Sequence, residues 1–230
     1  MRIGGIRAVL FDFDGTLVNT EVLVYVQAFL SAVKQMGLEK ANGFMCDQDI
    51  INFYRFKLCG VRRDRQSPAL ERAFPGADIT ALHKYFYDNS ITIAKAVGVQ
   101  RKAGVNEIFE YLHNKGIKIA IASMSKRPKL YEFCKIAGID LTNVACIIGG
   151  TDIKNAKPHP EIYLKSMETL GVTPNETVVV EDSSIGAWAG VNAGCKTILV
   201  RDFAPVTPEI GRVIYKILNK DCLIQLKELL

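Results

Sequence analysis

The residues from Gly104 to Val200 alternate regularly between helical patterns and short apolar runs of the kind that form buried strands. Apolar runs separated by helices are typical of a parallel sheet that is covered on both faces. The sequence therefore predicts an α/β fold with a Rossmann-like parallel sheet and helices on both of its faces. The expected strands are 8–11, 117–122, 145–148, 177–180 and 197–200, and the expected helices are 105–115, 127–137, 160–170, 184–193 and a closing helix from about Pro208 to Leu230.

One long segment, 19–95, departs from this alternation. It contains no clear strand-like run, and its apolar residues fit helices that are broken at Gly60, Pro68 and Pro75. We therefore expect two domains. The α/β core comprises residues 1–18 and 96–230, and an inserted all-helical cap domain comprises residues 19–95.

The composition is that of an ordinary globular protein, with 49% hydrophobic and 23% charged residues in a chain of 230. No apolar run approaches the roughly 18 residues that a membrane-spanning helix needs, and the N-terminus lacks the pattern of a signal peptide. The six cysteines show no metal-ligand spacing, which favours reduced thiols. We therefore expect a cytoplasmic monomer that does not associate with membranes.

The net charge of +5 is spread along the chain, and the densest basic cluster contains Arg62, Arg63 and Arg65. No aromatic platform or groove-reading motif accompanies this cluster, so nucleic-acid binding is not expected. A mildly basic surface suits a small anionic substrate instead.

Polar residues follow the first expected strand, at the edge of the sheet where ligands of such folds bind. The strand ends in Asp12-Phe13-Asp14-Gly15-Thr16, a D-x-D-G-T string that should occur by chance about once in 10⁵ positions. A simple Asp-Gly turn would explain Gly15 but not both carboxylates. Alternation along a strand places Asp12 and Asp14 on one side, about 6–7 Å apart, which leaves room for a phosphoryl group between them.

Candidate polar residues also follow the later strands. Taken singly, Ser123 is typical of a helix N-cap, Lys157 of a surface loop, and Glu181-Asp182 of the end of a strand. What favours a functional interpretation is their coincidence, because all of them are expected at the same edge of the sheet. Their order along the chain is also the one that phosphoryl chemistry requires.

These motifs resemble those of the haloacid dehalogenase superfamily. Asp12 to Thr16 match its first motif, DxDGT; Ser123 matches the second, Lys157 the third, and the pair Glu181-Asp182 the fourth. The resemblance spans residues 7 to about 200. The strings DFDGTLVNTE, KPHPEIY and EDSSIGAWAG are similar to the β-phosphoglucomutase-like branch, in which a cap is inserted between the first motif and the second strand.

The resemblance implies a role for each matching residue. Asp12 would attack phosphorus as the nucleophile and form an aspartyl-phosphate, and Asp14 would act as the general acid and base. Ser123 and Lys157 would bind the phosphate. The dehalogenases that named the superfamily lack an Asp at the position of Asp14, which favours phosphate chemistry over carbon–halogen cleavage.

A divalent cation is also implied, because a carboxylate that approaches a phosphate dianion is repelled. Mg²⁺ would be held by Asp12, the backbone carbonyl of Asp14 and the carboxylate of Asp182, and oxygen ligands of this kind suit Mg²⁺. Glu181 would act from the second shell, through water.

The favoured function is a phosphatase for a small phosphorylated metabolite, such as a sugar phosphate. A phosphomutase of the β-phosphoglucomutase type, a phosphonate hydrolase using Lys57, and a non-catalytic binding protein on the same fold remain alternatives.

Arg63 matches a cap arginine with which the mutases bind a distal phosphate. Val24 stands where the mutases carry a histidine that restrains the acid/base Asp, which favours the phosphatase.

Overall fold

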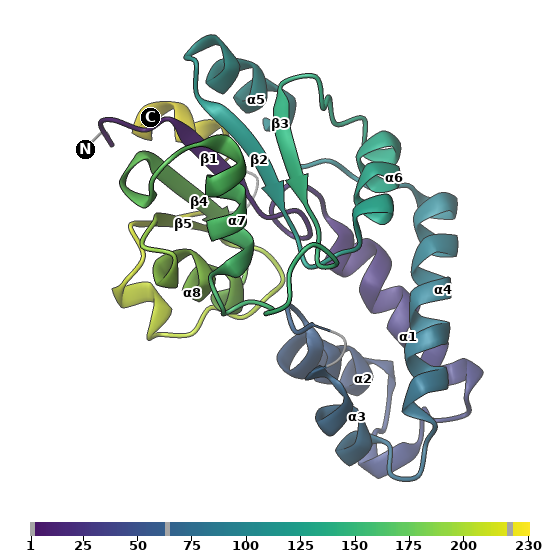
Figure 1. Ribbon diagram of the computed structural model, residues 1–230. Coiled ribbons are helices and arrows are strands. Elements are labelled where there is room, and N and C mark those ends of the chain that lie inside the picture. Colours follow the sequence, from purple (N-terminus) through teal and green to yellow (C-terminus); the bar gives the residue numbers. More distant parts are fainter. Residues whose placement is uncertain (1–2, 63–64, 220–222) are drawn as a thin grey trace. The chain divides into compact units, whose positions relative to one another are not determined.

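The computed structural model describes residues 3–62, 65–219 and 223–230 (Figure 1). The chain divides into two compact units. Met1–Val18 and Gln100–Leu230 form the first, which we call the core unit, and Asn19–Val99 form the second, which we call the helical unit. Within the described residues, no helix combines the length and the apolar character needed to cross a membrane.

The core unit contains a parallel sheet of six strands in the order β3-β2-β1-β4-β5-β6. The strands are β1 Ala8–Phe11, β2 Lys118–Ala122, β3 Val144–Ile148, β4 Thr177–Glu181, β5 Lys196–Val200 and β6 Lys216–Leu218. The helices of this unit are α5 Val105–Asn114, α6 Arg127–Ala137, α7 Glu161–Leu170, α8 Ser184–Asn192 and α9 Leu226–Leu229. The predicted α/β class with a parallel sheet is confirmed.

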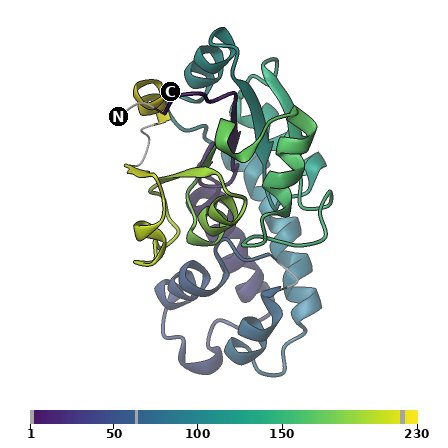
Figure 2. The same cartoon turned by 60° about the vertical axis from the view of Figure 1, so that its left-hand side comes forward.

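Helices cover both faces of the sheet. Neighbouring residues of β1 point to opposite faces and all of them are apolar, so each face needs a helix against it. Leu10 belongs to a buried cluster with Ile162 and Tyr163 of α7, whereas the ring of Phe11 lies 5.3 Å from that of Phe109 in α5. Figure 2 shows the sheet from another side. The amide of Ile3 donates to the carbonyl of Leu229 at 2.7 Å.

The strand register brings the carboxyl ends of the central strands to one edge. Phe11, the last residue of β1, pairs with Ile121 of β2 on one side and with Val180 of β4 on the other. The next residue, Asp12, donates its amide to the carbonyl of Val180 at 2.9 Å. Residues that follow β1, β2 and β4 in sequence are therefore neighbours in space.

The helical unit contains no strand among its described residues. Its centre is aromatic, since the ring of Phe29 lies 5.6–6.3 Å from four other aromatic rings, those of Phe53, Tyr54, Phe74 and Phe86. Its elements are a π-helical turn Glu21–Tyr25, α1 Val26–Gln35, a 3-10 turn Ala41–Gly43, α2 Asp47–Phe53, a π-helical turn Tyr54–Leu58, α3 Ser67–Ala73 and α4 Ile79–Val97. Pro68 lies in the first turn of α3, where a missing N–H costs nothing, so it begins a helix rather than breaking one.

The expected closing helix from Pro208 to Leu230 was wrong. The described part of this segment forms a 3-10 turn Ile210–Arg212, the strand β6, a second 3-10 turn Leu223–Gln225 and the short α9. β6 extends the sheet because Leu218 pairs with Val200 and accepts a hydrogen bond from the amide of Arg201 at 2.9 Å. Pairing with a distant strand overrode the local helical pattern.

Candidate active site

The loop after β1 is a tight turn built around Gly15. The Gly15 amide donates to the carbonyl of Val18 at 2.9 Å, and Gly15 has a φ of +87°, a conformation that residues with a side chain rarely adopt. A Cβ at this position would also collide with the carboxylate of Asp182. Glycine is therefore required here for two reasons, and its absence of a side chain lets the loop after β1 approach the end of β4.

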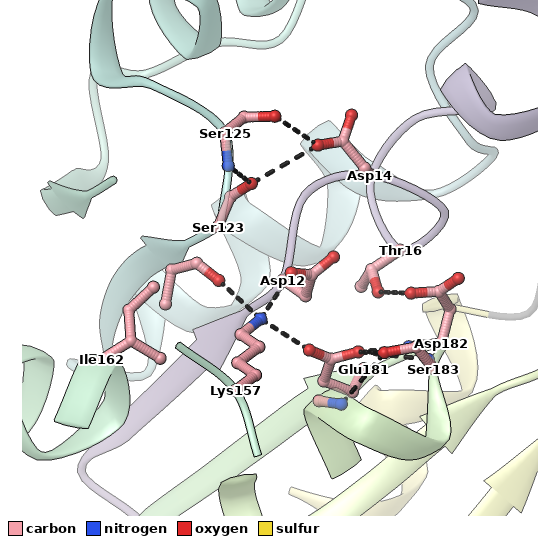
Figure 3. A network of polar contacts seen from close by, with 12 residues as sticks. Asp12, Asp14, Thr16, Ser123, Ser125, Lys157, Ile162, Glu181, Asp182 and Ser183 are labelled. Atoms are coloured by element: carbon pink, nitrogen blue, oxygen red, sulfur yellow. Dashed lines mark hydrogen bonds and ion pairs between the residues drawn. The ribbon is translucent and has the colours of Figure 1, made fainter. Parts of the chain in front are cut away.

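Lys157 joins the ends of three strands, β1, β2 and β4 (Figure 3). Its Nζ donates to Asp12 Oδ1 at 2.6 Å, to Glu181 Oε1 at 2.6 Å and to the carbonyl of Ala122 at 3.1 Å. Both ion pairs are buried. An ammonium has three protons, so these three acceptors satisfy the group completely.

The pKa values of Asp12 and Lys157 are set by burial and by the surplus of carboxylates around the ammonium. Burial raises the pKa of Asp12 well above its usual value, and the nearby Glu181 raises it further, whereas Lys157 lowers it. Burial acts to lower the pKa of Lys157, but Asp12 and Glu181 outweigh it, so that pKa lies well above its usual value. Lys157 therefore remains protonated at neutral pH.

Three buried carboxylates could hold a metal ion at this edge. One oxygen each of Asp12, Glu181 and Asp182 lie within 4.8 Å of one another. The only ammonium bonded to this group among the described ion pairs is that of Lys157. A set of oxygen donors with excess negative charge fits a hard divalent cation. Asp182 is further held by Thr16, whose hydroxyl donates to Oδ1 at 3.5 Å.

Asp14 faces a different set of partners. Its Oδ2 accepts from the hydroxyl of Ser125 at 2.8 Å and from that of Ser123 at 3.4 Å (Figure 3). The amide of Ser125 in turn donates to the hydroxyl of Ser123 at 3.1 Å. The two carboxylates of the D-x-D motif therefore have separate surroundings, one bonded to an ammonium and the other to two hydroxyls.

Sequence analysis missed Ser125 and Tyr163. Ser125 stands two residues after Ser123 in the same loop, and that short spacing was the available signal. Tyr163 lies in the first turn of α7 and has no such signal, because it fits the pattern of an ordinary buried helical residue. Its hydroxyl donates to Glu181 Oε1 at 2.9 Å. Burial and the nearby Glu181 raise the pKa of Tyr163 well above its usual value.

The structure brings together the six candidates of the core unit, at the carboxyl ends of β1, β2 and β4 and in the loop before α7: Asp12, Asp14, Ser123, Lys157, Glu181 and Asp182. Arg63 lies outside the described residues. Val24 is buried in the helical unit.

The chain matches known proteins over most of its length. The profile of the family described as haloacid dehalogenase-like hydrolase matches residues 9–200. Hexitol phosphatase A from Escherichia coli (strain K12) is 30% identical over 210 residues, which cover 90% of this chain and 88% of that protein. The protein SUPPRESSOR OF QUENCHING 1, chloroplastic, from Arabidopsis thaliana is 31% identical over 199 residues, which cover 86% of this chain but only 18% of that much longer protein.

The fold also has counterparts among solved structures. A mutant of CbbY from Rhodobacter sphaeroides, crystallised in complex with xylulose-(1,5)bisphosphate, matches the chain with a TM-score of 0.76. The match covers 95% of this chain and 96% of that one, at 22% sequence identity. At this level of identity the likeness concerns the fold.

Proposed function

The chain belongs to the haloacid dehalogenase-like hydrolases, and we propose that it is a Mg²⁺-dependent phosphatase that hydrolyses a small phosphorylated metabolite such as a sugar phosphate. The observation that carries this proposal is the buried carboxylate of Asp12, held 2.6 Å from the ammonium of Lys157 and separate from a second carboxylate, Asp14. Hexitol phosphatase A is named as a phosphatase, and the CbbY mutant of similar fold was crystallised in complex with a sugar bisphosphate.

In the first step, Asp12 attacks phosphorus opposite the leaving alcohol. A bond forms between the Asp12 carboxylate and phosphorus, and the ester P–O bond breaks. Asp14 gives its proton to the departing alkoxide, which leaves as the free alcohol. The product on the protein is an aspartyl-phosphate.

In the second step, water hydrolyses the aspartyl-phosphate. Asp14, now ionised, takes a proton from the attacking water, whose oxygen forms a bond to phosphorus while the Asp12–phosphorus bond breaks. Inorganic phosphate leaves and Asp14 is protonated again. Its separate surroundings suit this role, because the hydroxyl of Ser125, at 2.8 Å, orients the carboxylate and leaves the proton of the Ser123 hydroxyl for the phosphate.

Positive charge and hydrogen-bond donors must compensate the negative charge of the phosphate. Lys157 neutralises Asp12 and the phosphoryl group, and Ser123 donates to a phosphoryl oxygen. Mg²⁺, held by Asp12, the backbone carbonyl of Asp14 and Asp182, would supply Lewis-acid charge to the transferring group. Glu181 would lie behind these ligands, bonded to Lys157 and to the amide of Asp182. All of these groups lie in one unit of one chain, which supports a monomeric enzyme.

We propose that the helical unit contributes to substrate choice as a cap, with Arg63 as its phosphate-binding residue. An arginine fork binds phosphate in bidentate fashion, so the substitution Arg63→Ala should raise KM for substrates with a second phosphate.

The test measures how phosphate is partitioned. Sugar monophosphates and bisphosphates are incubated with the protein and Mg²⁺, and inorganic phosphate and isomeric sugar phosphates are quantified together, with Asp12→Asn as the control. We expect inorganic phosphate to dominate, because the side chain of Val24, which stands where the mutases carry a histidine, can neither donate nor accept a hydrogen bond. A predominance of isomer at saturating substrate would favour the mutase, and no turnover of any phosphoester would favour a non-catalytic protein.

A further inference from the structure

The buried phenol of Tyr163 donates a hydrogen bond to Glu181 in the acidic site, and no step of the proposed reaction uses it. Its side chain is fully buried, and the Nζ of Lys157 lies 5.0 Å from the centre of its ring. The residue therefore touches both members of the Lys157–Glu181 pair, the first with its ring and the second with its hydroxyl.

The carboxylate of Glu181 is saturated with hydrogen bonds. Oε1 accepts from Lys157 and Tyr163, at 2.6 and 2.9 Å. Oε2 accepts from the amide of Asp182 and from the amide and hydroxyl of Ser183, at 3.0–3.1 Å. A carboxylate offers about four lone-pair sites, so five donors leave no acceptor free.

Glu181 is also fixed sterically. A Cβ at Gly186, in the first turn of α8, would collide with its carboxylate. The position of Glu181 is therefore set by the protein, and what remains variable is how the ammonium of Lys157 is shared between Glu181 and Asp12 (Figure 3).

We propose that Tyr163 is a positioning residue, whose hydroxyl limits the attraction of Glu181 for Lys157 and so keeps the ammonium against Asp12. The proposal rests on the function proposed above. The Nζ of Lys157 lies 2.6 Å from an oxygen of each carboxylate, so both attract it at hydrogen-bond distance. The hydroxyl of Tyr163 supplies a second donor to the same oxygen of Glu181. Without that donor, Oε1 draws Lys157 toward Glu181, and Asp12 and the transferring phosphate lose part of their compensating charge.

The experiment compares Tyr163→Phe with Tyr111→Phe. The control removes a hydroxyl from another helix of the core unit, where it donates to the carbonyl of Lys227 at 3.4 Å. We expect Tyr163→Phe to lower kcat by about 10-fold or more, with KM changed by less than about threefold, because losing the hydrogen bond to the charged Glu181 weakens the hold of Lys157 on the nucleophile while Ser123 still binds substrate. Thermal unfolding establishes that both variants fold, and Tyr111→Phe should keep its kcat.

A double-mutant cycle separates positioning from packing. In the Glu181→Gln background the attraction for Lys157 is reduced, so adding Tyr163→Phe should lower kcat by less than about threefold. Additive losses, or a kcat within about twofold of the parent for Tyr163→Phe alone, would overturn the positioning role. Provided that the parent protein releases phosphate in the same assay, either outcome overturns the positioning role alone. A parent protein that turns over no phosphoester would instead reject the proposed function, and the inference with it.

Discussion

Lys157 and Asp12 form a buried ion pair, with 2.6 Å between Nζ and Oδ1, although 145 residues separate them in the sequence. The pair depends on the parallel register of β1 and β4, which sets Asp12 beside the end of the strand that carries Glu181. Removing one member of a buried pair leaves the other charge uncompensated, so this contact links the fold to the chemistry.

The substitution Asp12→Asn should abolish phosphate release while leaving the fold intact. The amide keeps the shape of the side chain but cannot attack phosphorus, so kcat should fall by more than about 10³-fold. Phosphate release and circular dichroism, measured on the same preparation, check both parts. Activity near that of the parent would contradict the aspartyl-phosphate mechanism.

Mg²⁺ should stabilise the protein through Asp182. A cation that binds only the folded state at a 100-fold excess over its Kd adds about 2.7 kcal/mol, which corresponds to a rise in Tm of roughly 5–10 °C for a chain of this size. We expect Asp182→Asn to lose this rise and Glu168→Gln, which changes an exposed carboxylate of α7, to keep it. Equal rises in both variants would place the cation elsewhere. Chelation with EDTA should stop phosphate release, and added Mg²⁺ should restore it.

Gly186→Ala should disrupt the site from within a helix. Its Cβ would collide with the Glu181 carboxylate, which would have to leave Lys157 and Tyr163 or force α8 outward. We expect a loss of more than about 2 kcal/mol in the free energy of unfolding and a large loss of kcat. Gly211→Ala is the matched control, because nothing lies within 4 Å of its Cβ position. Similar urea denaturation midpoints for the two variants would show that the carboxylate accommodates the methyl group.

Glu176 should stabilise the fold in a pH-dependent way. Hydrogen bonds from the Thr173 backbone and from Arg7 lower the pKa of Glu176 to about 2. A carboxylate whose pKa is lower in the folded than in the unfolded state contributes stability above its unfolded pKa, and that contribution is lost as the pH falls toward about 2. Glu176→Gln should therefore have a lower Tm than the parent at pH 7, and the difference should shrink between about pH 4.5 and pH 2. A difference that is constant over this range would mean that charge is not involved.

The sequence alone determined the strands that carry the site. β1, β2, β4 and β5 are continuous apolar runs, so both their positions and their parallel pairing could be predicted from local pattern, within one or two residues at each end. The polar residues that follow them were found for the same reason, since parallel strands end at one edge. β6 was missed because it is only three residues long and forms by pairing with β5.

Only the tertiary structure decided how these side chains are connected. That Lys157 divides its protons between Asp12 and Glu181, that Ser125 holds Asp14, and that the hydroxyl of Tyr163 shares an oxygen of Glu181 with Lys157 are all contacts between distant segments. Sequence periodicity reports which face of an element is buried. It does not report which polar atom meets which, because that depends on how elements far apart in the chain pack against one another.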